Sequence, residues 1–201
     1  MVAKREPYLT VDEWRELERS SHDIKHEYVD GQVYAMSGGS LAHSRIGLNI
    51  CTALENALAA ENKSCYVYNS DAATRLSSKR YTYPDASVTC DERDKPALDK
   101  TEVQAPCVIV EVLSDSTEAY DRGRKFLLYR TCSSVQEYVL VATKYQAVEV
   151  YRRTSQGWTA YQFYGPGDEI ELTCLAIHFP LSVLYRNAAV PESMDDLEGE
   201  V

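Results

Sequence analysis

The sequence predicts an α/β protein in which a mixed central sheet is flanked by helices. Residues 107–113 are apolar at every position except Glu111 and rich in β-branched side chains, which is typical of a central strand covered on both faces. Between residues 41 and 60, apolar side chains recur with helical spacing, so we expect the longest helix there, packed on the sheet. Residues 114–117 have turn and N-cap chemistry, and residues 118–132 then predict a second helix.

An N-terminal helix and a hairpin are expected in addition to the central sheet and its flanking helices. Thr10, followed three positions later by Glu13, forms the capping-box pattern that begins a helix, and this helix should end near residues 20–21. Residues 26–36 predict two strands around Asp30-Gly31, a dipeptide that favours the tight turn of a hairpin.

The region between the long helix and the central strand predicts further strands. Residues 66–76 are strand-like, with a turn around residues 69–70, and residues 83–90 form a strand that starts at a proline. Residues 77–83 are expected as a polar loop, and residues 91–106 as a charged, irregular segment.

Three more strands are predicted after the second helix, followed by a turn and a short last strand. Their ranges are 137–142, 147–152 and 158–164 for the strands, 165–168 for the turn and 169–172 for the last strand. The sequence contains no internal repeat or break that favours two domains, so we expect a single domain over residues 1–190. Residues 191–201 carry five acids and no base and are expected to form a disordered tail.

The charge balance argues against a protein that binds nucleic acid through overall positive charge. The formal net charge is −10, and without the tail it is still 21 − 26 = −5. A local basic patch remains compatible with this balance: Lys79, Arg80, Arg122 or Arg124 beside a cleft would favour a phosphate substrate.

The cysteines and the hydropathy predict a cytoplasmic protein without a membrane anchor. There are six cysteines, and the nearest pair, Cys51 and Cys65, is 14 positions apart, so there is no zinc-binding CxxC pattern. We expect all six as small apolar side chains in a reducing compartment. Residues 1–7 contain no apolar segment of a signal peptide, and no run of 18 apolar residues occurs.

Glu111 is the residue that needs an explanation. An unpaired carboxylate in a covered strand costs several kcal/mol or stays protonated, so a metal ion, a lysine or an arginine should lie beside it. Asp85 precedes it by 26 positions, and on a neighbouring strand the two carboxylates could form a Mg²⁺ site. Asp121, Lys125 and Tyr129 share one helix face, from which Lys125 can reach the end of the strand.

At these residues the chain resembles the PD-(D/E)xK nuclease superfamily and, more narrowly, the Uma-two family of restriction-endonuclease-like proteins. The segments that carry the resemblance are 83–85, 110–114, 121–125 and the hairpin with Glu27. The resemblance implies a restriction-endonuclease-like fold and a metal-dependent nuclease that hydrolyses DNA phosphodiester bonds. It implies that Asp85, Glu111 and the carbonyl of Val112 bind Mg²⁺ or Mn²⁺.

The resemblance also implies catalytic roles. Lys125 would be the catalytic lysine, because the position that the motif gives to lysine holds Leu113. Glu27 would be an accessory acid. His43, near the start of the long helix, is expected mainly as a hydrogen-bonding residue.

Two other interpretations stay open. The chain could be a catalytically inactive nuclease-like module for binding or assembly, with Glu111 and Lys125 as a structural ion pair. It could also act as a homodimer, paired through the hairpin or through the strands near residues 151–164.

Overall fold

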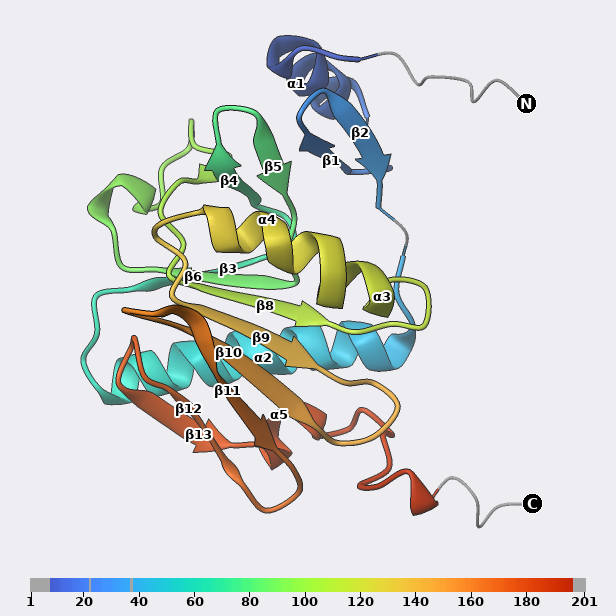
Figure 1. Cartoon of the computed structure of the whole chain (residues 1–201), viewed down its shortest axis with the longest axis vertical. Helices are drawn as coiled ribbons and strands as arrows, with labels where there is room; N and C mark the ends of the chain where they lie inside the picture. The colour runs from blue at the N-terminus through green and yellow to red at the C-terminus, as the bar shows by residue number, and fades with distance from the viewer. Residues whose placement is uncertain (1–7, 22, 37, 197–201) are drawn as a thin grey trace.

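The computed structural model describes residues 8–21, 23–36 and 38–196 (Figure 1). Its largest sheet has six strands in the order β11-β10-β9-β8-β6-β3. The strands are β3 (Tyr66–Asn69), β6 (Ala86–Thr89), β8 (Val108–Val112), β9 (Glu137–Val141), β10 (Val148–Thr154) and β11 (Gly157–Tyr164). Strands β8 and β9 are parallel, whereas β6 pairs with β8 antiparallel, so the expected mixed central sheet is confirmed.

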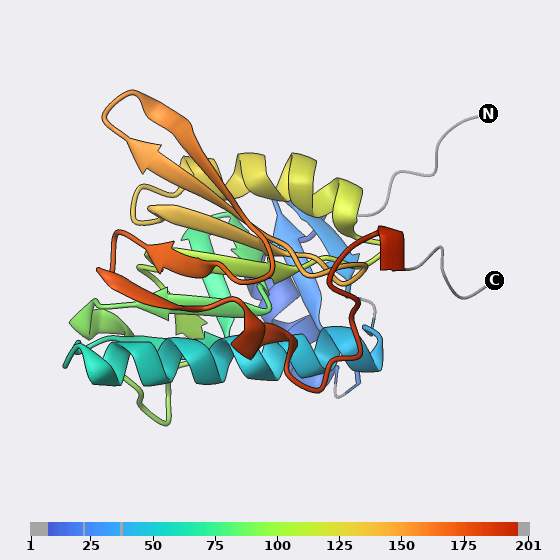
Figure 2. The ribbon, with the colours of Figure 1, turned by 90° about the horizontal axis from the view of Figure 1, so that it is seen from below.

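Helices cover the two faces of this sheet (Figure 2). On one face lies α2 (Leu41–Ala60), at the predicted place. On the other lies a helical segment composed of α3 (Glu118–Tyr120), a π-helical turn η2 (Asp121–Lys125) and α4 (Phe126–Thr131). The prediction of one helix over residues 118–132 is therefore confirmed in position, but its middle turn is wider than an α-helix.

The alternation of side chains along β8 decides which face receives Glu111. Val108, Val110 and Val112 pack in the same buried cluster as the apolar face of α2. Ile109 and Leu113 belong to the cluster of α4 on the opposite face. Because successive side chains of a strand point to opposite faces, Glu111 points with Ile109 and Leu113 toward the helical segment α3–η2–α4.

The N-terminal hairpin belongs to a second sheet of five strands, in the order β2-β1-β5-β4-β7. These strands are β1 (His26–Val29), β2 (Gln32–Ala35), β4 (Ala73–Ser77), β5 (Arg80–Thr82) and β7 (Glu102–Val103). The polar loop expected over residues 77–83 was therefore wrong: β5 pairs with both β1 and β4, and its Tyr81 is buried. The irregular segment 91–106 likewise contains β7 and a 3₁₀ turn, η1 (Glu92–Asp94).

The local signals of the N-terminal region are confirmed. Helix α1 (Val11–Ser20) has the full capping box of Thr10 and Glu13. The turn between β1 and β2 places Asp30 and Gly31 at φ of 50° and 94°, a left-handed conformation that glycine adopts without steric cost. Trp14 of α1 packs on Tyr81, with their ring centroids 4.6 Å apart.

Two C-terminal elements were not predicted. Strand β12 (Glu169–Leu172) occupies the place of the expected last strand, but it pairs with β13 (Ile177–Pro180), and α5 (Ser182–Tyr185) follows. Ile170, Leu172 and Ile177 are buried in the same cluster as α2. The short hairpin thus extends the core on the α2 side.

The expectation that all six cysteines are thiols was wrong for one pair. Cys65 and Cys90 form a disulfide. The reason lies in the register of β3 and β6: Tyr66 pairs with Thr89, which brings the flanking Cys65 and Cys90 opposite each other. No local sequence pattern announces such a pairing.

The chain ends are described in part. Of the predicted acidic tail, residues 191–196 are described, and the carbonyl of Pro191 accepts a hydrogen bond from the amide of Gln146. Residues 197–201, like residues 1–7, lie outside the described residues. Within the described part of the chain, no helix is both long and apolar enough to cross a membrane.

Candidate active site at the end of the central strand

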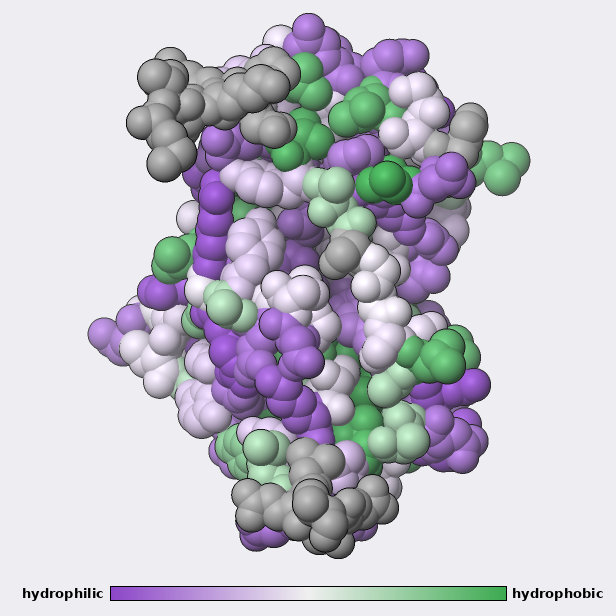
Figure 3. Space-filling view, turned by 90° about the vertical axis from the view of Figure 1, so that its right-hand side faces the viewer, coloured by the Kyte–Doolittle hydropathy of each residue, from purple (hydrophilic) through white to green (hydrophobic). Residues whose placement is uncertain are grey.

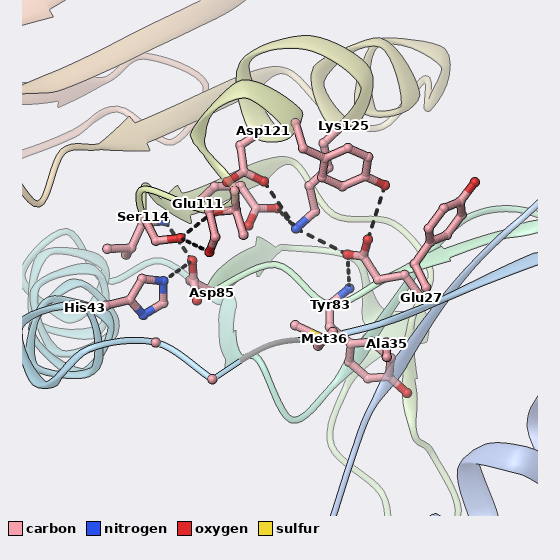
Figure 4. Close-up of a pocket in the computed structure, with 17 residues that line it drawn as sticks. Glu27, Ala35, Met36, His43, Tyr83, Asp85, Glu111, Ser114, Asp121 and Lys125 are labelled. Atoms are coloured by element: carbon pink, nitrogen blue, oxygen red, sulfur yellow. Dashed lines mark hydrogen bonds and ion pairs between the residues drawn. The ribbon is translucent and has the colours of Figure 1, made fainter.

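A cavity of about 250 Å³ lies where β8 ends, between the two sheets and the start of α2 (Figure 4). Four carboxylates line it: Glu27, Asp85, Glu111 and Asp121. Among its described lining residues, Lys125 and His43 are the ones that can carry a positive charge. Hydrophilic residues predominate on the side of the molecule to which β8 points, and hydrophobic ones form small separate groups there (Figure 3).

The register of β6 and β8 brings Asp85 and Glu111 together. Ala86 pairs with Val110 in this antiparallel ladder, so the next position on each strand places Asp85 beside Glu111. Asp85 lies just before β6, where its Oδ2 accepts a hydrogen bond of 2.7 Å from the amide of Val112. The predicted convergence of the two carboxylates is confirmed by this geometry.

Lys125 lies among three carboxylates. Its Nζ is 2.9 Å from Oε1 of Glu111 and 3.2 Å from Oε1 of Glu27, and it lies 3.7 Å from Oδ1 of Asp121. Lys125 and Asp121 come from the π-helical turn η2, a local distortion that is frequent at functional sites. The helix face predicted from the sequence is the one that meets the strand.

The electrostatics of Glu111 and Lys125 follow from burial and from each other. Burial raises the pKa of Glu111 well above its usual range, although Lys125 acts in the opposite direction. Burial alone would lower the pKa of Lys125, but the carboxylates of Glu111 and Glu27 raise it well above its usual range. The charged form of Lys125 is therefore favoured, and among the described lining residues four acids face two groups that can carry a positive charge.

Tyr129 completes the surroundings of Glu111. Its hydroxyl donates a hydrogen bond of 2.6 Å to Oε1 of Glu111, the same oxygen that faces Lys125. The helix face that carries Lys125 thus also supplies a neutral donor one turn later, and together they fix the orientation of the Glu111 carboxylate.

Glu27 reaches the cavity from β1, on the second sheet. Its Oε1 accepts a hydrogen bond of 3.2 Å from the amide of Tyr83, and its Oε2 accepts one of 3.4 Å from the hydroxyl of Tyr120. Glu27 is buried. Glu27 contacts the ammonium of Lys125 from the second sheet, while Glu111 contacts it from the central sheet.

His43 occupies the opposite wall of the cavity, in the first turn of α2. Its Nε2 lies 3.4 Å from Oδ2 of Asp85. This contact with Asp85 raises the pKa of His43 above its usual value, against the effect of burial. His43 thus lies near the helix start, as the sequence indicates, and its imidazole contacts one of the predicted metal ligands.

The donor set fits a hard divalent cation. Within the described residues, no hydrogen bond uses Oδ1 of Asp85 or Oε2 of Glu111, so each carboxylate keeps one oxygen for a further ligand. No group of three or more His, Cys, Asp or Glu side chains in the described ranges could hold a metal ion on its own. Two carboxylates with a neighbouring backbone carbonyl suit Mg²⁺, which retains several waters, better than Zn²⁺, which prefers closed sites of nitrogen and sulfur ligands.

The basic residues considered from the sequence lie elsewhere. Arg80 pairs with Asp30, and Arg122 pairs with Glu118 and Glu149. The guanidinium of Arg124 lies over the ring of Tyr34. None of these arginines, and not Lys79, is among the described residues that line the cavity.

Sequence reasoning missed Tyr120 and Thr117 as cavity residues, and gave Asp121 only a minor place. Burial raises the pKa of Asp121, and the hydroxyl of Thr117 acts against this shift. The signal for Asp121 was its spacing from Lys125. Tyr120 had no comparable signal, because its partner Glu27 lies 93 positions away.

Comparison with known proteins identifies relatives of this chain. The chain is 39% identical over 184 residues to the uncharacterized protein slr1290 of Synechocystis sp., covering 91% of this chain and 94% of that protein. It is 29% identical over 179 residues to the uncharacterized protein sll1609 of the same organism, covering 88% and 99%.

A solved structure shares the fold. It is described as a "putative nuclease belonging to DUF820 from Anabaena variabilis", and it superposes with a TM-score of 0.71 at 18% identity, covering 89% of this chain and 98% of that one. A family model described as "Uma2: Putative restriction endonuclease" matches residues 11–183. The chain therefore belongs to the Uma2 family.

Proposed function

We propose that this protein is a Mg²⁺- or Mn²⁺-dependent nuclease that hydrolyses DNA phosphodiester bonds. The observation that carries the proposal is the charge of the cavity: among its described lining residues, four carboxylates face one lysine and one histidine. A buried excess of negative charge is unstable unless protons or a cation compensate it. A divalent cation bound in the cavity would neutralise this excess negative charge and could take part in catalysis.

Asp85, Glu111 and the carbonyl of Val112 are the groups that would hold the ion. The free oxygens of the two carboxylates and the carbonyl at the end of β8 are oxygen donors of the kind that Mg²⁺ prefers. When bound, the ion would supply Lewis-acid activation of water and neutralisation of phosphate charge. The protein would contribute the fixed positions of these ligands.

Lys125 would act as a charged hydrogen-bond donor. Burial would lower the pKa of Lys125, but the carboxylates of Glu111 and Glu27 raise it above its usual value, which favours the ammonium form. Its ammonium would orient a water molecule and stabilise negative charge that develops on the phosphate oxygens. Glu27, as an accessory acid, holds the ammonium in place from the second sheet.

DNA is the proposed substrate, although the chain as a whole is acidic. With a net charge of −10 and the nearby arginines engaged with acidic or aromatic partners, non-specific affinity for DNA should be weak without the ion. The metal and Lys125 would then provide most of the local attraction for a phosphate.

Cleavage assays test this proposal. Linear, circular and single-stranded DNA are incubated with the full chain and Mg²⁺, and with the variants Asp85→Ala and Glu111→Ala. Asp99→Ala, which changes an exposed acid away from the cavity, serves as the control. We expect cleavage by the wild type and the control and none by the two cavity variants; cleavage that persists in both would rule out the assignment.

A catalytically inactive binding or assembly module is the second candidate, and the position of Lys125 favours it. Nζ already has three carboxylate neighbours, so Glu111 and Lys125 could form a structural pair without any ion. In that case Glu111→Gln should change mainly the stability, and calorimetric titration with Mn²⁺ should give no heat of binding.

A homodimer through β11 extends either candidate. This strand forms one edge of the six-stranded sheet, and its eight residues include no charge and no proline. Edge strands usually carry charged residues or proline, which prevent pairing with another chain. Analytical ultracentrifugation of the wild type and of Tyr161→Lys would show whether a dimer forms and whether a charge on β11 dissociates it.

A further inference from the structure

The first turn of α2 is fixed in several ways on the wall of the cavity. Ser40 caps the helix, with its Oγ accepting a hydrogen bond of 3.1 Å from the amide of His43. Three residues further, Ile46 is fully buried against the central sheet. The backbone of His43 therefore has little freedom, and the imidazole is presented to the cavity from a rigid helix end.

The loop before the helix restricts the ring itself. A Cβ added at Gly39 would lie 2.7 Å from both Cγ and Nδ1 of His43, closer than atoms in contact can approach. These atoms belong to the base of the ring and cannot move away without turning the imidazole. A Cβ at the neighbouring Gly38 would meet nothing within 4 Å. Gly39 thus leaves room for one particular placement of the His43 ring.

That placement directs His43 to one oxygen of Asp85. Nε2 of His43 and the amide of Val112 both approach Oδ2, at 3.4 Å and 2.7 Å. The side chains of His43 and Asp85 are four-fifths buried, so water competes weakly for these contacts. Together these two contacts hold Oδ2 in place, and among the described residues no hydrogen bond uses Oδ1. Figure 4 shows His43 directed at Asp85.

We propose that His43 is a positioning residue that holds Asp85 for metal binding, and that Gly39 is the position that permits it. The inference rests on the proposed function, since it assigns the support of a metal ligand. Residues that contact a metal ligand and fix its orientation typically contribute about 10- to 100-fold to metal affinity. His43 would provide this support from α2, whereas Val112 provides it from β8.

Calorimetric titration of the full chain with Mn²⁺ and with Mg²⁺ tests the inference. The variants are His43→Ala, His43→Gln and Gly39→Ala, with Gly38→Ala and the exposed Arg45→Ala as matched controls. We expect His43→Ala to weaken both metals about 10- to 100-fold and by similar factors. Gly39→Ala should act in the same direction, His43→Gln should recover part of the affinity through its amide donor, and the controls should bind as the wild type does.

Cleavage at varied Mg²⁺ concentration gives an independent result. In His43→Ala the concentration for half-maximal rate should rise, while the rate at saturating Mg²⁺ should change much less. Thermal unfolding without metal verifies that each variant is folded.

The outcomes separate this inference from the proposed function. If the wild type binds neither metal, both the proposed function and the role of His43 are wrong. If the wild type binds and His43→Ala binds equally well, the role of His43 alone is wrong. A loss for Mn²⁺ far larger than for Mg²⁺ would place the imidazole among the ligands themselves, because nitrogen favours the softer ion, and would also overturn the positioning role.

Discussion

Nζ of Lys125 lies 2.9 Å from Oε1 of Glu111, and both side chains are almost fully buried. The two residues come from a π-helical turn and from the middle of the central sheet. This contact supplies the charged partner that the sequence predicts for Glu111 in β8. The same ammonium also lies near Glu27 and Asp121, so three of the four carboxylates of the cavity share it.

Lys125→Met should be strongly destabilising. The change removes a buried ammonium and leaves its carboxylate partners unpaired, which typically costs about 3–5 kcal/mol. The free energy of unfolding measured in urea at neutral pH checks this. The double variant Glu111→Gln, Lys125→Met should lose less than the sum of the single changes, and strict additivity would mean that the two groups do not interact.

Mn²⁺ should stabilise the folded protein. A ligand that binds only the folded state adds about 2.7 kcal/mol at a free concentration about 100 times its Kd. Thermal unfolding at increasing Mn²⁺ measures the effect, with Na⁺ at equal ionic strength as the control. The rise in unfolding temperature should disappear in Glu111→Ala. An equal rise in that variant would show that the ion binds elsewhere.

Tyr129→Phe isolates the hydrogen bond to Glu111. The hydroxyl is fully buried and donates at 2.6 Å, so its removal leaves Oε1 with Lys125 alone and should cost about 1.5–3 kcal/mol. Urea denaturation of this variant is compared with that of Tyr161→Phe, in which the lost hydroxyl is exposed and donates at 3.3 Å. Similar values for the two variants would contradict a special role of the buried donor.

The pair of Arg122 and Glu149 should make stability depend on acid pH. Burial would raise the pKa of Glu149, but hydrogen bonds from Arg122 and two tyrosines lower it overall, below its ordinary value of 4.5. Because the folded-state pKa is the lower one, the stabilisation is complete above pH 4.5 and is lost as the pH falls through the folded-state pKa.

Unfolding of the wild type and of Glu149→Gln across this range measures that contribution. The difference between the two proteins should be on the order of 1 kcal/mol near neutral pH and should shrink in acid. Glu61→Gln, at an exposed position after α2, should give a difference that does not follow this course. A difference for Glu149→Gln that is constant with pH would argue against the ion pair as its source.

Cys65→Ser should remove the stabilisation that the disulfide contributes. Closing a loop over a sequence separation of 25 restricts the unfolded chain by about 3 kcal/mol in the chain-entropy model. Unfolding of the oxidised wild type should become easier in dithiothreitol, whereas Cys65→Ser should not respond to it. Cys51→Ser, which changes a free thiol, serves as the control and should respond like the wild type.

Local sequence patterns determined the elements around the site. The capping box at Thr10, the Asp-Gly turn and the helical period over residues 41–60 each act within a few residues, and the structure places these elements where the sequence predicts them. The buried acid in a β-branched run identified Glu111, and helical spacing placed Lys125 and Tyr129 on the face that meets it. These inferences succeed because spacing along one helix or strand fixes the direction of a side chain.

Only the tertiary structure decided which distant residues meet. Strand β5 is short and polar in sequence and becomes a strand because β1 and β4 pair with it, while β13 is paired by β12. The register of β3 and β6 joins Cys65 to Cys90, and the packing of α2 brings His43 to Asp85 across 42 positions, 85 − 43. Such contacts depend on the pairing of whole elements. The free energy for this pairing comes from burial over the complete core. The residues that make the contact therefore need no recognisable pattern in the sequence.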